Sequence, residues 1–158
     1  MDKAITTGLL IIAGIVASLA LMNAVIPAVG QSSSALLTAN STASDRIRTD
    51  IEIIHVASDT SPVGEDQILV WVKNIGSTNI APVSQGDIFL TTPTTITRIP
   101  YGSGVGTWDY TVEGGGTDWT QAVTVKMTLH LANGIAVGAY SVKVTVYNSV
   151  SAEKDFSL

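Results

Sequence analysis

The chain contains no cysteine among its 158 residues. It therefore forms no disulfide, and it has no thiolate to bind a metal or to act as a nucleophile. Charge is also scarce: Asp, Glu, Lys and Arg make up 13% of the residues, the net charge is −5, and no basic cluster occurs. Because nucleic-acid phosphates are bound through grouped lysines and arginines, a nucleic-acid partner is not expected.

The longest stretch without charge runs from Ala4 to Ser44, and residues 5–29 within it are almost continuously apolar. Thirteen large apolar side chains lie in those residues. Burying each of them is worth about 1.5–3 kcal/mol, or on the order of 20–40 kcal/mol together. A whole domain is typically stable by only about 5–15 kcal/mol. The segment must therefore enter lipid, a partner, or a bundle of its own copies.

The spacing of this apolar segment predicts one long helix. Small residues recur every three or four positions and large residues follow the same period, so each set forms a stripe along a helix. The expected helix-packing interface consists of Leu9, Ile12, Ala13, Val16, Ala17, Leu19, Ala20, Ala24 and Ala28. A stripe of small residues lets apolar helices approach closely. It favours packing between helices over the alternative, a lone membrane anchor.

The helical pattern continues past the apolar segment to residue 49. Pro27 is expected to kink the helix or loosen a turn, because it cannot donate a hydrogen bond to the carbonyl of Asn23. A lipid-spanning helix needs about 20 residues, whereas an unbroken helix of this length would measure roughly 65–70 Å. A membrane anchor has no need of the extension, but a filament core does. Asn40, in Asn40-Ser41-Thr42, is a candidate N-glycosylation site, with chance occurrence as the alternative.

From Asp50 onward the apolar period changes to two, which is typical of half-buried antiparallel strands. The strands expected are residues 51–56, 67–73, 87–90, 95–99, 108–112, 123–131, 140–147 and 153–158. Turn signals separate them at 61–64, 74–77, 114–116 and 133–134. This number of short strands fits an immunoglobulin-like sandwich, with an open barrel as the alternative. The predicted fold is α+β: a hydrophobic helix domain over 1–49 and a sandwich domain over 50–158.

The sequence offers little chemistry for a reaction. His130 falls on the polar face of its strand and is expected to be solvated, and His55 has no Ser or Asp at a triad spacing. Asp59, Glu65 and Asp66 crowd one loop that could bind a hard cation, although a solvated loop is the favoured interpretation. We therefore expect no enzymatic activity, no cofactor and no metal site.

Three segments resemble a known family. The head Met1–Ala4, followed by Ile5 and the apolar helix, resembles the class III signal boundary of archaellins, the archaeal flagellins of the type IV pilin-like superfamily. This resemblance implies a processing site at Lys3, Ala4 and Ile5. Residues 46–54 and 69–78 resemble the junction between helix and sandwich in the archaellum F and G proteins. Most pilins place a Glu early in the helix, and its absence between Ala4 and Ser44 favours the archaellin side.

The resemblance implies a structural subunit that polymerises through its helix into an extracellular archaellum filament for motility. Its partners would be copies of itself, with a membrane assembly platform and a motor ATPase, and it would be inserted in the membrane before assembly. Two alternatives stay open. One is a low-copy archaellum component that anchors the filament or contacts the surface layer. The other is a single-pass membrane protein that displays an immunoglobulin-like adhesion module.

Overall fold

The computed structural model describes residues 2–60, 65–132 and 135–158. The chain divides into two compact units, Met1–Ala43 and Ser44–Leu158. The last turn of the helix thus belongs to the same unit as the strands. The turns expected at 61–64 and 133–134 lie outside the described residues.

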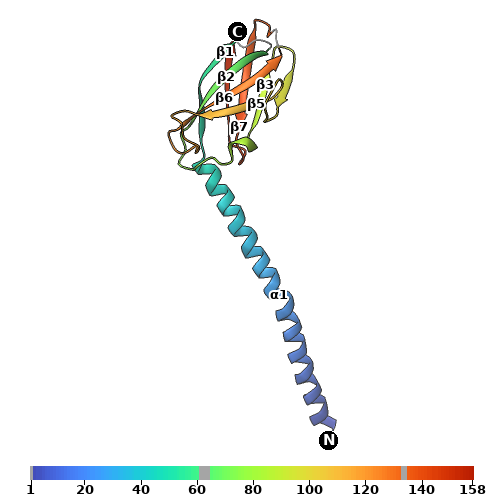
Figure 1. The fold of residues 1–158 in the computed structure, drawn as a ribbon. Helices are drawn as coiled ribbons and strands as arrows, with labels where there is room; N and C mark the ends of the chain where they lie inside the picture. The colour runs from blue at the N-terminus through green and yellow to red at the C-terminus, as the bar shows by residue number, and fades with distance from the viewer. Residues whose placement is uncertain (1, 61–64, 133–134) are drawn as a thin grey trace. The chain divides into compact units, whose positions relative to one another are not determined.

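The helix α1 comprises Asp2–Arg48 and continues through Pro27 without a break (Figure 1). Hydroxyl side chains along it donate back to carbonyls one turn earlier, as Ser18 does to Gly14 at 2.8 Å and Thr38 does to Ser34 at 3.0 Å. Asp2 lies in the first turn and two arginines lie in the last, which complements the helix dipole. The predicted single long helix is confirmed, and Pro27 does not end it.

Eight strands in the described residues form two antiparallel four-stranded sheets. They are β1 (Ile51–Asp59), β2 (Glu65–Asn74), β3 (Asp87–Thr91), β4 (Ile96–Ile99), β5 (Trp108–Val112), β6 (Thr124–Ala132), β7 (Ala139–Thr145) and β8 (Ser151–Ser157). The strand orders are β1-β2-β6-β5 and β4-β3-β7-β8. These orders correspond to the A-B-E-D and C′-C-F-G sheets of immunoglobulin domains. The sandwich prediction is confirmed, and the open barrel was the wrong alternative.

The core lies between the two sheets and follows the predicted alternation. In β6, Val125, Met127 and Leu129 are buried, and in β7, Val142 and Val144 are buried. Antiparallel strands send alternate side chains to opposite faces, so the apolar set of each strand meets the facing sheet.

The three tryptophans divide between the core and the surface. Trp108 and Trp119 are fully buried. Trp71 lies half-buried on the outer face of the first sheet, where its Nε1 donates to Glu113 at 3.1 Å. The tryptophans therefore serve the core of the sandwich and the packing on its surface.

A β-bulge in β1 is stabilised by a lysine from the other sheet. The pairing of β1 with β2 shifts between Ile53 and His55, which marks a β-bulge. Lys154 of β8 donates from Nζ to the carbonyl of Ile53 at 3.2 Å and to that of Ile54 at 2.8 Å. The lysine thus satisfies backbone acceptors that a bulge removes from the ladder, and it ties together the edges of the two sheets.

Candidate functional site: an exposed apolar helix and a clamped helix end

The apolar side chains of α1 are exposed. All thirteen large ones between Ile5 and Val29 expose between 48% and 72% of their surface, and α1, which the structure describes throughout, contains no buried residue. By length and composition it is the one helix in the described residues that could cross a membrane. The packing interface predicted from Leu9 to Ala28 lies on this helix, and its packing against other helices stays a prediction.

The C-terminal end of α1 is held by the loop that follows β2. The amide of Ser77 donates to the carbonyl of Arg48 at 2.8 Å. The amides of Ile75 and Gly76 both donate to the carbonyl of Asp50, each at 3.0 Å. The last carbonyls of a helix have no partner within the helix, and here a loop nearly thirty residues further along the chain supplies the donor to Arg48.

A buried asparagine fixes the shape of that loop. Asn74 donates from Nδ2 to the carbonyls of Thr78 at 2.8 Å and Trp119 at 3.0 Å, and its Oδ1 accepts from the amide of Gly76 at 3.0 Å. Its side chain is fully buried. A buried polar group of this kind is favourable only when its hydrogen bonds are satisfied, so the network specifies one conformation for residues 74–78.

A second contact comes from the turn between β7 and β8. Thr49 is buried, and its hydroxyl donates to the carbonyl of Asp45 at 2.7 Å. The same hydroxyl accepts from Nδ2 of Asn148 at 2.7 Å. Two separate loops of the sandwich therefore form hydrogen bonds with the end of α1. We call residues 45–50, 74–78 and 148 the helix clamp.

Gly76 lies at the tightest point of the helix clamp. A Cβ atom at this position would lie 2.5 Å from the carbonyl oxygen of Arg48 and would also collide with the amide nitrogen of Asp50. Both are backbone atoms, which cannot rotate away as a side chain can. The close approach requires glycine for steric reasons. Residues 46–54 and 69–78 are the two segments that resemble the archaellum F and G proteins, and the structure brings them into contact.

The two histidines have partners on the first sheet. His130 is not solvated as predicted: it is half-buried, with Nε2 3.3 Å from Oδ2 of Asp109 and Nδ1 3.4 Å from Nε2 of Gln67. The prediction was wrong because Gln67 and Asp109 come from the neighbouring strands β2 and β5, which flank β6. The ring of His55 lies 5.2 Å from that of Trp71.

The acidic residues near the start of β2 are described only in part. Within the described part of the chain, no group of three His, Asp or Glu side chains is placed to hold a metal ion. Asp66 instead accepts from the backbone amide of Ile135 at 3.0 Å through Oδ2. The side chain of Glu65 lies outside the described residues.

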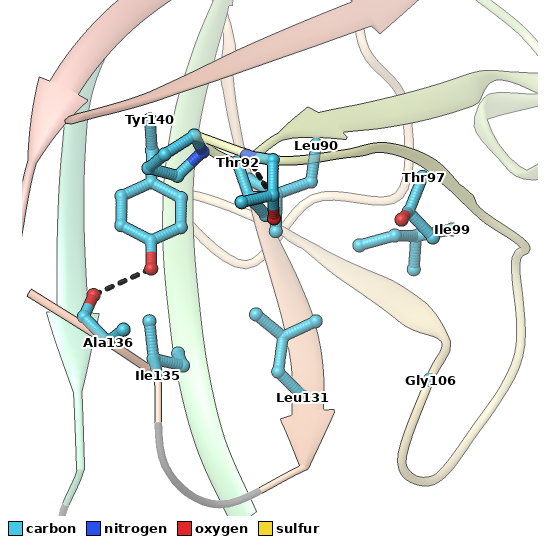
Figure 2. Close-up of a pocket in the computed structure, with 11 residues that line it drawn as sticks. Leu90, Thr92, Thr97, Ile99, Gly106, Leu131, Ile135, Ala136 and Tyr140 are labelled. Carbon is cyan, nitrogen blue, oxygen red and sulfur yellow. Dashed lines mark hydrogen bonds between the residues drawn. The ribbon is translucent and has the colours of Figure 1, made fainter. Parts of the chain in front are cut away.

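A cavity of about 520 Å³ opens between strand ends of the sandwich (Figure 2). Leu90, Ile99, Leu131 and Ile135 contribute apolar walls. Tyr140 is the one titratable side chain in its described lining, and its hydroxyl donates to the carbonyl of Ala136 at 2.6 Å. Sequence analysis missed this cavity because its walls come from strands far apart in the chain. Its surface suits an apolar group and assembles no catalytic set.

The fold and the exposed helix together define a class: a protein with one membrane-type helix followed by one immunoglobulin-like sandwich. The chain is 32% identical over 161 residues to an uncharacterised protein of Archaeoglobus fulgidus, with 98% of each chain covered. It belongs to the same family as that protein. No family model matches the chain.

Two solved structures share the fold. FlaG, an archaellum periplasmic stator protein of Sulfolobus acidocaldarius, matches with a TM-score of 0.59 and 16% identity, over 68% of this chain and 99% of FlaG. A chain of the archaellum periplasmic stator complex of FlaF and FlaG from the same organism matches with a TM-score of 0.54 and 16% identity. This match covers 67% of the present chain and 87% of the matched chain. At this level of identity the similarity establishes the fold alone.

Proposed function

We propose that this protein is a component of the archaellum that α1 holds in the membrane, and that its sandwich acts outside the membrane as part of a stator. The observation that carries the proposal is the match of 68% of this chain to 99% of the periplasmic stator protein FlaG. The resemblance of residues 46–54 and 69–78 to archaellum F and G proteins supports the same assignment independently of the strand order.

The dimensions of α1 suit membrane insertion. Residues 5–29 would extend about 37 Å as a helix, and the hydrocarbon core of a bilayer is about 30 Å thick. The segment carries no charge and therefore meets the main requirement for a spanning helix. Insertion hides the thirteen apolar side chains that the chain itself leaves exposed.

The helix clamp suits a part that bears load. A stator must resist the force of the rotating part. Direct hydrogen bonds from two loops hold the last turn of α1 and the residues that follow it within the sandwich unit. We further propose that the protein is not an enzyme, needs no cofactor, and binds other archaellum proteins, in the way that FlaF and FlaG form a complex.

A filament subunit is the second candidate function. It is favoured by the length of α1, 47 residues, and by the uncharged run that extends to Ser44, well beyond the apolar segment. In that case the alanine stripe from Ala13 to Ala28 would pack between copies in the filament core, and the sandwich would form the outer wall of the filament. The membrane platform and the motor ATPase would assemble the filament.

Shearing of filaments from cells separates the two candidates. With an epitope added after Leu158, we expect the protein to stay in the membrane fraction after shearing and to resist extraction by alkaline carbonate. The filament protein of the same cells is the control and should appear in the sheared fraction. Recovery of most of the tagged chain with the sheared filaments would instead establish the filament subunit.

A further inference from the structure

A second periodicity runs along α1, on a different face from the alanine stripe. Alternating steps of three and four residues from Ile5 reach thirteen positions, of which nine hold large apolar side chains. The positions are Ile5, Gly8, Ile12, Ile15, Leu19, Met22, Ile26, Val29, Ser33, Leu36, Asn40, Ala43 and Ile47. This is the a/d pattern of a coiled coil, and it keeps one phase from the first turn to the last. We call this face the heptad seam.

We propose that two copies of this chain pair through the heptad seam as a parallel, in-register coiled coil, with Asn40 of one copy facing Asn40 of the other. The inference rests on the membrane insertion proposed above, because insertion in a single direction forces the paired helices to be parallel. It adds the identity of a partner to that function.

The part of α1 beyond the apolar segment is the reason that a partner is needed. Leu36 and Leu37 are each 71% exposed and Ile47 is 84% exposed in the described chain. Residues 31–44 are rich in Ser and Thr and contain no charged pair that could support a helix from its surface. Isolated helices are marginal in water even for better sequences. Packing against another helix both covers these leucines and keeps the segment helical.

The chemistry of the seam points to a second copy as that partner. The helix carries no charge from Ala4 to Ser44, so a charged partner would find no complement there, whereas another copy is equally neutral. Asn40 occupies an a position, and its amide has both a donor and an acceptor, so two such amides satisfy each other. A single Asn at an a position fixes register, because the amides meet only when the helices are aligned.

The seam meets the residue preference of a dimer at the position beyond the apolar segment. Four of the seven a positions hold isoleucine, and the six d positions hold Gly8, Ile15, Met22, Val29, Leu36 and Ala43. Isoleucine at a with leucine at d favours two strands, and Leu36 is the d position that follows this rule. Pro27 follows the a position of Ile26, so it lies off the seam. The alanines from Ala13 to Ala28 also fall at outer positions.

This pairing gives Asn40 a role that excludes the one predicted from its sequon. An amide in the seam cannot carry a glycan, and the sequon lies within continuous helix, where Ser41 and Thr42 both donate to the carbonyl of Thr38. Staggered helices, as in a filament, would not bring Asn40 of one copy to Asn40 of the next.

The test uses disulfide formation, for which the absence of cysteine leaves a clean background. The full chain with Asn40→Cys is oxidised in native membranes and run on a non-reducing gel. We expect at least fivefold more covalent dimer than with Thr38→Cys, the matched control two residues away on the outer face. The intact mass of the unmodified chain should show Asn40 without a glycan.

Three outcomes would overturn the pairing: equal dimer from both variants, no dimer from either, or a glycan on Asn40. Membrane retention of each variant is measured in the same samples. Retention in the membrane without a covalent dimer would contradict the pairing and would leave the stator proposal unaffected. Recovery of the chain in sheared filaments would instead contradict the stator proposal.

Discussion

Replacing Gly76 with alanine is expected to lower the free energy of unfolding of the sandwich by about 3 kcal/mol or more, a large share of a typical domain's stability. The new methyl group would overlap backbone atoms of Arg48 and Asp50. To make room, the loop after β2 must withdraw, and its hydrogen bonds to the end of α1 would break. Urea unfolding of the full chain in detergent, followed by tryptophan fluorescence, measures the loss, since all three tryptophans lie in the sandwich.

Gly116→Ala is the matched control for this experiment. The nearest atom to a Cβ at Gly116 is Cγ1 of Val112 at 3.8 Å, an ordinary contact. We expect its free energy of unfolding to stay within about 0.5 kcal/mol of that of the unmodified chain. If Gly76→Ala proved as stable as Gly116→Ala, the contacts of the helix clamp would not stabilise the sandwich as described above.

Two aspartates in the apolar segment are expected to release the protein from the membrane. On an insertion scale, thirteen large apolar residues contribute roughly −4 to −8 kcal/mol, and each central aspartate costs about 2.5–3.5 kcal/mol. Ala17→Asp alone should therefore leave most of the protein inserted, whereas Ala17→Asp with Ala24→Asp should cancel most of the driving force. Membrane flotation followed by immunoblotting measures the inserted fraction.

The control carries the same two charges outside the apolar segment, as Ser34→Asp with Ala35→Asp. These positions lie off the heptad seam, and the variant should float with the membrane like the unmodified chain. Equal flotation of the two double variants would contradict insertion of residues 5–29. Loss of sheared filaments in Ala17→Asp alone would support the filament candidate, since a single charge on the alanine stripe blocks close helix packing.

Local patterns were enough to predict most of the fold. The alternation from Val123 to Leu131 appears as β6, and the period of the apolar segment appears as α1. In these elements the hydrophobic period and the intrinsic preference agree, so neighbours in the sequence decide the structure. The bulge at Ile54 was not predictable in this way, because the lysine that stabilises it comes from β8, a hundred residues further along the chain.

The helix clamp could be anticipated only in part. Sequence alone predicts an ordinary turn at Asn74 and Gly76, and these residues do form a turn. Their second role depends on Asp50 and Arg48 lying against the loop, and that contact follows from the pairing of Ile51 with Asn74 in the first sheet. The paired side chain of His130 was missed for the same reason, since Asp109 reaches it through strand order and not through sequence spacing.

The position of the protein on living cells tests the central claim most directly. Ser103 lies exposed in the glycine-rich segment before β5, and the chain has no cysteine, so Ser103→Cys gives it a single thiol for a maleimide dye. The unmodified strain measures the background. We predict labelling confined to the cell envelope at the filament base. Labelling along the whole length of the filament would contradict the account and would make the chain a filament subunit.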